Sequence, residues 1–251
     1  MKNIYTLENM ITKEEQFTVR AYDCQTNGTL KIFSLMQYLQ VIATIHAEEL
    51  GFGISHLDKI NSYWVLSNIR IDFTRLPVWK EDISIQTWPS GHSRLIATRE
   101  FTGKDQNKNE LFRAGSQWMI LNKDNNRPQN LLNLNLDMPN NGTKAISEKI
   151  KRLEAGNEYT PIGQMLVPYN SIDLNGHVNN TEYVRWGIDA LNKIHKPRGK
   201  ILSFQATYLS ELFEGDELDL LIRSINNRYC VLMKRMNTDE IVFLMENTFS
   251  I

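Results

Sequence analysis

The chain has 251 residues, of which 41% are hydrophobic and 23% are charged, as in ordinary globular proteins. Its 28 basic and 29 acidic residues nearly cancel, so the charge gives no reason to expect nucleic acid as a partner. Two cysteines are too few for a disulfide framework or a four-cysteine zinc site. The opening residues lack the apolar core of a secretory signal, and no run of about 18 apolar residues occurs. We therefore expect a cytoplasmic protein without membrane insertion.

The first block of the chain opens with an extended segment at 15–24 and continues with a helix over 29–51. Apolar residues recur at helical spacing along that helix and extra ones widen the stripe, which predicts a helix buried on most sides. Gly51 is expected to end it. Runs rich in β-branched and aromatic residues, separated by turn signals, then predict four strands near 63–76, 82–90, 94–103 and 110–122.

The composition changes after Lys123, where asparagine, lysine and proline become frequent. We interpret residues 126–157 as a linker between two domains, with one short helix near 146–153. The predicted domains are residues 1–125 and 158–251.

The second block repeats the order of the first: an extended segment at 159–170, a helix at 179–194, and four strands near 200–212, 216–224, 228–236 and 240–251. Asp23 and Asp173 align at an offset of 150, and Phe73 and Tyr208 at an offset of 135, so the first block carries about 15 extra residues between helix and sheet. A long helix before a run of strands excludes a doubly wound fold. It fits two α+β units, each a curved antiparallel sheet around a helix.

The stretch DLNGHVNNTEYVRW, residues 173–186, gathers hydrogen-bonding side chains before a helix. Asp173, Asn175 and His177 alternate by two, so in an extended segment they would share one face. Asn179 is a candidate N-cap, with Glu182 completing a capping box. The polar residues are interpreted either as an elaborate cap or as a substrate site at the positive end of the helix.

This motif, together with YDCQTNGTLKIFSLMQYLQ and YWVLSNIRIDFTRLPVWKEDISIQTW, resembles the acyl-acyl-carrier-protein thioesterases of plant plastids and their bacterial relatives. The resemblance covers nearly the whole chain and is weakest in the linker. It implies a tandem (double) hotdog fold. It also implies hydrolysis of the thioester between a fatty acyl chain and the phosphopantetheine arm of acyl carrier protein, without a cofactor or metal.

Position by position, the resemblance implies catalytic roles for Asp173, Asn175 and His177. Tyr208 and Glu211 match a downstream tyrosine and glutamate of the plant enzymes, but Leu212 stands where those enzymes have cysteine. A thiol nucleophile at that position is therefore impossible here.

Thioester hydrolysis needs an activated water and a stabilised carbonyl oxygen, while the thiol is an easy leaving group. We expect Asn175 to hold the carbonyl or the water, and His177 to orient the water or protonate the sulfur. Either Glu211 or Asp173 is the general base, with Glu211 favoured. Asn179 and the helix amides would contact the substrate.

The first block lacks a histidine at the matching positions, so only the second half is expected to catalyse. The resemblance implies that the first half binds the acyl chain, although the candidate residues could equally be plain core: Met36, Leu39, Trp64 and Trp118. A basic segment after the catalytic helix is a candidate dock for an acidic carrier protein, or simply a solvated loop: Lys193, Lys196, Arg198 and Lys200.

Three other functions fit the sequence less well. They are an acyl-coenzyme A thioesterase, a hotdog dehydratase acting on 3-hydroxyacyl thioesters, and a non-catalytic acyl-binding protein. Chain length, saturation and oligomeric state, with a homodimer as one option, are left open.

Overall fold

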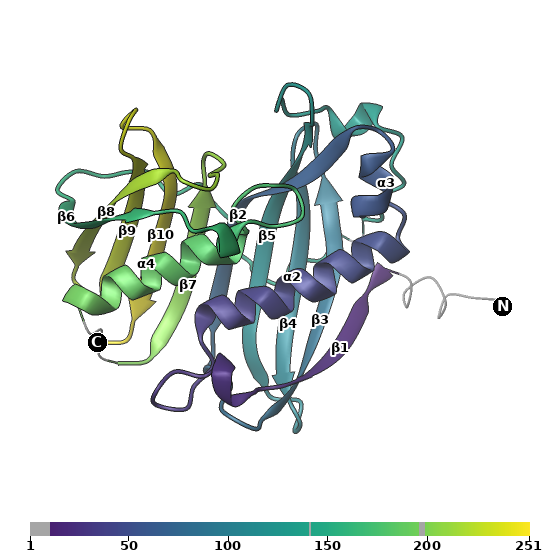
Figure 1. Cartoon of the computed structure of the whole chain (residues 1–251). Coiled ribbons are helices and arrows are strands. Elements are labelled where there is room, and N and C mark those ends of the chain that lie inside the picture. The colour runs from purple at the N-terminus through teal and green to yellow at the C-terminus, as the bar shows by residue number, and fades with distance from the viewer. Residues whose placement is uncertain (1–10, 141, 196–198) are drawn as a thin grey trace. The chain divides into compact units, whose positions relative to one another are not determined.

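The computed structural model describes residues 11–140, 142–195 and 199–251, and it divides the chain into two compact units (Figure 1). The first unit holds the chain up to Ser67 and Leu76–Ile150, and the second holds Asn68–Arg75 and Lys151–Ile251. Most of the segment interpreted as a linker therefore belongs to the first unit. Among the described residues, no helix is both long and apolar enough to cross a membrane.

The sheet of the first unit has the strand order β1-β3-β4-β5-β2. Helix α2 (Ile32–Glu49) lies across one face of these strands (Figure 1). A short helix α3 (Ile54–Asp58) and the 3-10 turns η1 (Ala21–Asp23) and η2 (Leu131–Asn133) complete the unit. The strands are β1 (Lys13–Thr18), β2 (Ser62–Phe73), β3 (Asp82–His92), β4 (Ala97–Asp105) and β5 (Glu110–Asn122).

Helix α2 is buried along most of its length, as its sequence predicts, because apolar residues occupy most of its turns. Gly51 follows it with φ +82°, the left-handed conformation that favours glycine at this position. The Gly51 amide donates to Glu48 O and the Phe52 amide to Ala47 O, both at 3.1 Å. These two bonds form a Schellman motif and confirm Gly51 as the end of the helix.

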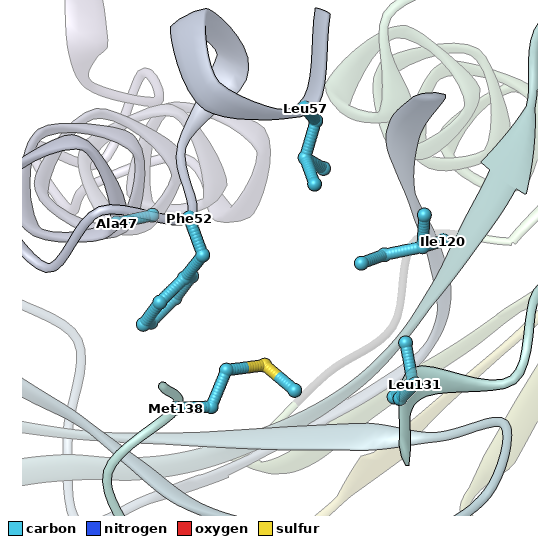
Figure 2. Close-up of a cluster of buried hydrophobic side chains, with 6 residues drawn as sticks. All are labelled: Ala47, Phe52, Leu57, Ile120, Leu131 and Met138. Atoms are coloured by element: carbon cyan, nitrogen blue, oxygen red, sulfur yellow. The ribbon is translucent and has the colours of Figure 1, made fainter. Parts of the chain in front are cut away.

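The end of α2 and the residues that follow it build a hydrophobic cluster with the end of β5 and part of the predicted linker (Figure 2). Trp64 packs against this cluster and donates its indole N–H to Phe52 O at 2.8 Å. The linker is therefore bound to the first unit by apolar packing. The cluster consists of Ala47, Phe52, Leu57, Ile120, Leu131 and Met138.

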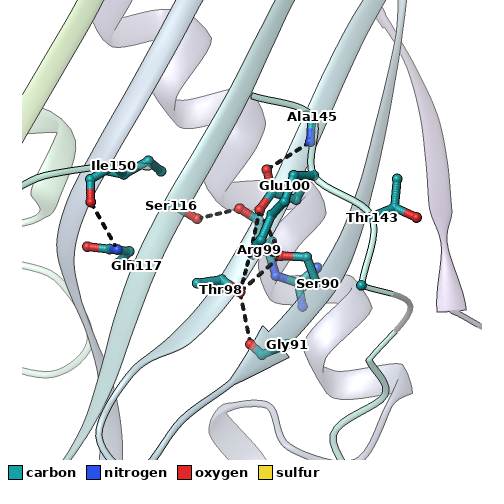
Figure 3. Close-up of polar contacts among 12 residues, drawn as sticks. Ser90, Gly91, Thr98, Arg99, Glu100, Ser116, Gln117, Thr143, Ala145 and Ile150 are labelled. Atoms are coloured by element: carbon teal, nitrogen blue, oxygen red, sulfur yellow. Dashed lines mark hydrogen bonds and ion pairs between the residues drawn. The ribbon is translucent and has the colours of Figure 1, made fainter. Parts of the chain in front are cut away.

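Further along, the linker covers a buried carboxylate on the sheet (Figure 3). Glu100 accepts hydrogen bonds from the Ser90 hydroxyl at 2.7 Å and the Ala145 amide at 3.1 Å, and Lys144 Nζ lies 3.1 Å from it. The predicted helix near 146–153 is wrong, because residues 145–153 form bends and irregular chain. There the chain makes bonds to the sheets: Ile150 O accepts from Gln117 at 3.4 Å, and the Leu153 amide donates to Thr207 Oγ1 at 2.9 Å.

The second unit repeats the design with α4 (Asn180–Ile194) and the strand order β2-β7-β10-β9-β8-β6. Its share of β2, Asn68 to Asp72, pairs antiparallel with β7. Helix α4 lies across one face of these strands and contacts β8, β9 and β10 (Figure 1). The bounds are β6 (Thr160–Leu166), η3 (Tyr169–Ser171), β7 (Ile201–Tyr208), β8 (Glu217–Ile225), β9 (Arg228–Arg235) and β10 (Ile241–Phe249).

Hydrogen bonds give the correspondence between the units. The 3-10 turns and the helix starts of the two units are separated by 148 residues, so the predicted offset of 150 is wrong. In the hairpin before α2, the Gln25 amide donates to Thr29 O at 2.7 Å; before α4, the Asp173 amide donates to His177 O at 2.8 Å. The offset of 150 paired Asp23 with Asp173 because they are identical, but they do not occupy equivalent positions. The residues opposite Asp173, Asn175 and His177 are Gln25, Asn27 and Thr29.

The offset of 135 for the strands agrees with the bonding pattern. The Val19 amide donates to Glu81 O in the first unit, and the Val167 amide donates to Asp216 O in the second, each at 2.9 Å. Since 148 minus 135 is 13, the first unit carries 13 extra residues, and α3 lies within that stretch. The first unit still offers no histidine opposite His177 and no glutamate opposite Glu211, where Leu76 stands.

Candidate active site

The residues before α4 form a tight hairpin rather than the extended segment that the sequence predicted. Ile172 and Val178 form an antiparallel bridge, and the Gly176 amide donates to Asp173 O at 3.0 Å. Gly176 has φ +79°, which a residue with a side chain adopts only at a cost. The face-sharing argument from alternation is therefore wrong, because the chain reverses direction between Asp173 and His177.

The carboxylate of Asp173 shapes this hairpin. Its Oδ1 accepts the Asn175 amide at 2.8 Å, which is an Asx-turn. Asn175 and Leu174 at the tip are exposed, Leu174 to 95%. An exposed apolar side chain beside an exposed amide makes the hairpin tip accessible to a partner or substrate.

His177, at the end of this hairpin, forms an acid–imidazole pair with Glu211. His177 Nδ1 lies 3.5 Å from Glu211 Oε1, and the two side chains are 18% and 21% exposed. The Phe213 ring packs against the imidazole in a T-shaped arrangement, with centroids 5.0 Å apart. Both side chains are thus mostly buried but keep a part of their surface exposed to solvent.

The backbone ties the two halves of this pair together. The Val178 amide, next to His177, donates to Leu212 O, next to Glu211, at 2.9 Å. The Leu212 side chain is fully buried. Leu212, the position where the family resemblance leads one to expect cysteine, therefore belongs to the core, and its backbone carbonyl links the segment of Glu211 to that of His177.

The start of α4 confirms half of the predicted cap. Asn179 Oδ1 accepts from the Thr181 amide at 3.0 Å and from the Thr181 hydroxyl at 2.9 Å. The prediction of a capping box is wrong. The Asn179 amide donates to Ser171 O and not to Glu182. The Glu182 carboxylate instead contacts the Ser171 hydroxyl and Arg185. With its oxygen engaged twice, Asn179 could contact a substrate only through its NH₂ group.

Two buried tyrosines bond to backbone carbonyls next to this site. Tyr208 donates its hydroxyl to Asn180 O at 2.9 Å, and Tyr183 donates to Ser210 O at 3.4 Å. Burial raises the pKa of both phenols well above the ordinary value near 10, so both stay neutral donors. Tyr208 therefore fixes the start of α4.

The remaining predicted residues lie elsewhere. Met36 and Leu39 are buried in α2, and Trp118 donates its indole N–H to Ser116 Oγ at 2.8 Å. These residues and Trp64 belong to the first unit, where Met36 and Leu39 are core residues and the two tryptophans are half-buried. Lys193 and Lys200 are exposed, whereas Lys196 and Arg198 lie outside the described residues.

Two features of the site escaped sequence reasoning. In the sequence, Phe213 is not distinguished from other apolar residues, and no local pattern links it to His177. Arg235, described below, lies in a strand whose register alone brings it to the site. Across the described ranges, no group of three or more histidine, cysteine or acidic side chains is placed to hold a metal ion.

Two helices, each wrapped by an antiparallel sheet, and an acid–imidazole pair at the helix start of the second define a tandem hotdog protein. The acyl-ACP thioesterase N-terminal domain model matches residues 11–135, and the acyl-ACP thioesterase C-terminal domain model matches residues 156–249. The chain belongs to the acyl-ACP thioesterase family.

Individual relatives agree with this placement. The chloroplastic oleoyl-acyl carrier protein thioesterase of Coriandrum sativum is 26% identical over 235 residues, covering 85% of this chain and 63% of that protein. A chloroplastic palmitoyl-acyl carrier protein thioesterase of Arabidopsis thaliana is 25% identical, covering 78% of this chain and 51% of that protein. The chain thus spans less than two thirds of the length of these curated relatives.

Solved structures share the architecture. An acyl-ACP thioesterase from Bacteroides thetaiotaomicron superposes with a TM-score of 0.84 at 28% identity, covering 97% of this chain and 99% of that one. The 12:0-ACP thioesterase from Umbellularia californica also gives 0.84, at 21% identity, with coverages of 96% and 97%. The second likeness concerns the fold alone.

Proposed function

We propose that this protein hydrolyses the thioester between a fatty acyl group and the phosphopantetheine arm of acyl carrier protein, releasing free fatty acid. The observation that carries the proposal is the 3.5 Å approach of His177 Nδ1 to Glu211 Oε1 beside the start of α4. Its support is that both halves of the chain match the family models and that named relatives act on acyl carrier protein.

The reaction needs a proton acceptor beside the thioester. Glu211 takes a proton from a water, directly or through His177, as the water oxygen adds to the carbonyl carbon. The carbon–sulfur bond then breaks, the acyl group leaves as a carboxylic acid, and the sulfur receives a proton. Because a thiol has a pKa of about 8.5, its departure needs little assistance.

The other polar residues would orient these groups. Asn175 is placed at the exposed tip, where its amide could contact the carbonyl oxygen or the water. Asp173 supports the hairpin through the Asn175 amide, so we assign it a shaping role and give the role of base to Glu211. The positive end of α4 favours the negative charge that develops on the carbonyl oxygen.

The substrate class follows from the relatives, which act on oleoyl and palmitoyl groups carried by acyl carrier protein. For this chain we propose fatty acyl chains bound in the apolar interior of the first unit, near Met36 and Leu39. We also propose docking of the carrier protein at the basic segment that includes Lys193 and Lys200. We expect the protein to act in the cytoplasm, and a homodimer stays an open possibility for its assembly.

The test incubates the purified full chain with a panel of acyl-acyl carrier proteins and identifies the released acids by mass spectrometry. We expect free fatty acid and free carrier thiol in equal amounts, and near-complete loss of both with His177→Ala. An exposed histidine of the first unit, His92, provides the matched control as His92→Ala.

Parallel coenzyme A thioesters distinguish the neighbouring functions. Faster hydrolysis of coenzyme A thioesters would assign the substrate differently, and water elimination from 3-hydroxyacyl chains would indicate a dehydratase. Tight acyl binding without any release of thiol would contradict hydrolysis altogether.

A further inference from the structure

Glu211 does not belong to a strand but to a short connection between β7 and β8, residues 209–216, here called the Glu211 loop. The amides of Leu209 and Ser210 both donate to Val242 O in β10, at 2.9 and 3.3 Å. These bonds fix the beginning of the loop. The part that carries Glu211, Leu212 and Phe213 needs other contacts to hold its conformation.

Arg235, the last residue of β9, supplies those contacts. Its Nη2 donates to Glu211 O at 2.9 Å, and its Nη1 pairs with the Asp216 carboxylate. Asp216 Oδ2 in turn accepts the Phe213 amide at 2.9 Å. One guanidinium therefore holds the loop on both sides of Leu212, whose carbonyl receives the bond from Val178.

The same side chain is itself well fixed. Its Nε lies 3.3 Å from Glu240 Oε2, and its side chain is 17% exposed. A planar guanidinium that binds three acceptors at once has little rotational freedom. Arg235 thus holds the Glu211 loop in a fixed position relative to the β9–β10 hairpin.

The first unit shows that the fold does not require this arginine. Ile83 and Leu218 are equivalent at the offset of 135; Ile83 pairs with Asp105, and Leu218 pairs with Arg235. Asp105 points its carboxylate into its own hairpin, where it accepts the amides of Asn107 and Asn109. One contact of the second unit does have a counterpart in the first. Glu81 accepts the Val78 amide there, just as Asp216 accepts the Phe213 amide in the second unit. In the second unit, the position opposite Leu218 holds an arginine, and this arginine contacts the connection that carries Glu211.

We infer that Arg235 is a positioning residue for the hydrolysis, which sets the Glu211 carboxylate and the Phe213 ring against His177. This inference rests on the proposed function, since it assigns a task to the same site. It predicts that the loss of Arg235 affects the chemical step and not the binding of the acyl chain.

The kinetic experiment compares Arg235→Met and Arg235→Lys with wild type on an acyl-acyl carrier protein. We expect kcat to fall about 10- to 100-fold in Arg235→Met with little change in KM, because small displacements of catalytic groups cost this much. Arg235→Lys should be intermediate, because an ammonium can pair with Asp216 but cannot replace the planar fork. Millimolar guanidinium should restore part of the kcat of Arg235→Met.

The matched control is Arg223→Met. Arg223 also belongs to the second unit and also contacts a backbone carbonyl, Asn157 O at 3.3 Å, but it lies toward the other end of β8. We expect its kcat to stay near that of wild type.

A second readout does not depend on turnover. The NMR signals of the His177 ring sense the ring current of Phe213, so they should shift in Arg235→Met and stay in place in Arg223→Met. If wild type hydrolyses no thioester, the proposed function fails, while this measurement still tests the positioning role.

Two results would overturn the inference. One is a kcat near wild type with unmoved His177 signals in Arg235→Met. The other is a loss of activity that only follows the loss of folded protein and responds neither to guanidinium nor to lysine.

Discussion

At the scale of single residues, the site reduces to two carboxylates with different tasks. Asp173 accepts a backbone amide of its own hairpin, whereas Glu211 approaches the imidazole of His177. Asp173 is thus engaged in holding its hairpin, while the Glu211 carboxylate lies beside an imidazole that can relay a proton. The geometry therefore supports Glu211 as the base.

Substitution by the matching amide distinguishes these tasks. Glu211→Gln removes the proton acceptor and should lower kcat by roughly 10² or more. Asp173→Asn keeps an oxygen that can accept the Asn175 amide, so its kcat should fall much less. The measurement is kcat at saturating acyl-acyl carrier protein.

Glu214→Gln is the control, since Glu214 is an exposed acid of the same loop. A near-normal kcat in Glu211→Gln together with a severe loss in Asp173→Asn would transfer the role of base to Asp173.

At the scale of elements, the two units share the hairpin before the helix, but only the second carries the proposed catalytic residues on it. Gly28 and Gly176 occupy the same place in it, with φ +80° and +79°. An added Cβ would find no atom within 4 Å at either glycine, so only backbone conformation opposes a side chain there. The two positions form a natural matched pair.

Gly176→Ala and Gly28→Ala should therefore destabilise by similar amounts, on the order of 1–2 kcal/mol each for a left-handed residue. Denaturant unfolding followed by circular dichroism measures this cost. Only Gly176→Ala should lower kcat, because it alone displaces Asp173 and His177. A loss of kcat in Gly28→Ala as large as in Gly176→Ala would contradict the assignment of catalysis to the second unit.

The elements also show where sequence reasoning succeeds. β5 occupies residues 110–122 as expected, because β-branched and aromatic residues between turn signals define it without help from distant contacts. The helix near 146–153 fails, since Ile150 and Leu153 in this segment bond to side chains of the strands. Local propensity cannot anticipate partners that lie far away in sequence.

The site was predictable only in part for the same reason. The motif identified Asp173, Asn175 and His177 by type, but their arrangement depends on the left-handed Gly176, which turns the chain. The approach of His177 to Glu211 depends on the bond between Val178 and Leu212. The contribution of Arg235 depends on the register of β9, which no local pattern specifies.

At the scale of the whole molecule, the proposed activity needs a macromolecular substrate, so the surface matters as well as the site. Lys193 in the last turn of α4 and Lys200 beyond the helix are both exposed. Exposed charges act mainly on association with an oppositely charged partner and are screened by salt.

Reversing both charges, as Lys193→Glu with Lys200→Glu, should raise KM for acyl-acyl carrier protein several-fold at low salt and hardly change hydrolysis of a small acyl thioester. Lys104→Glu is the control, because Lys104 is an exposed lysine on β4 of the first unit. Equal effects on both substrates, or an effect of Lys104→Glu as large, would refute this dock.

Strand β2 has a consequence for how the chain is made. Its second half is built early in the sequence but finds its hydrogen-bonding partner, β7, only after residue 200. Until β7 has been synthesised, the edge of Asn68 to Asp72 that pairs with it has unpaired backbone N–H and C=O groups. Such an edge promotes association between incompletely folded chains. A fragment that stops at Ile150 would keep that edge permanently, so expressing the first half alone should yield a self-associating product and not a well-behaved domain.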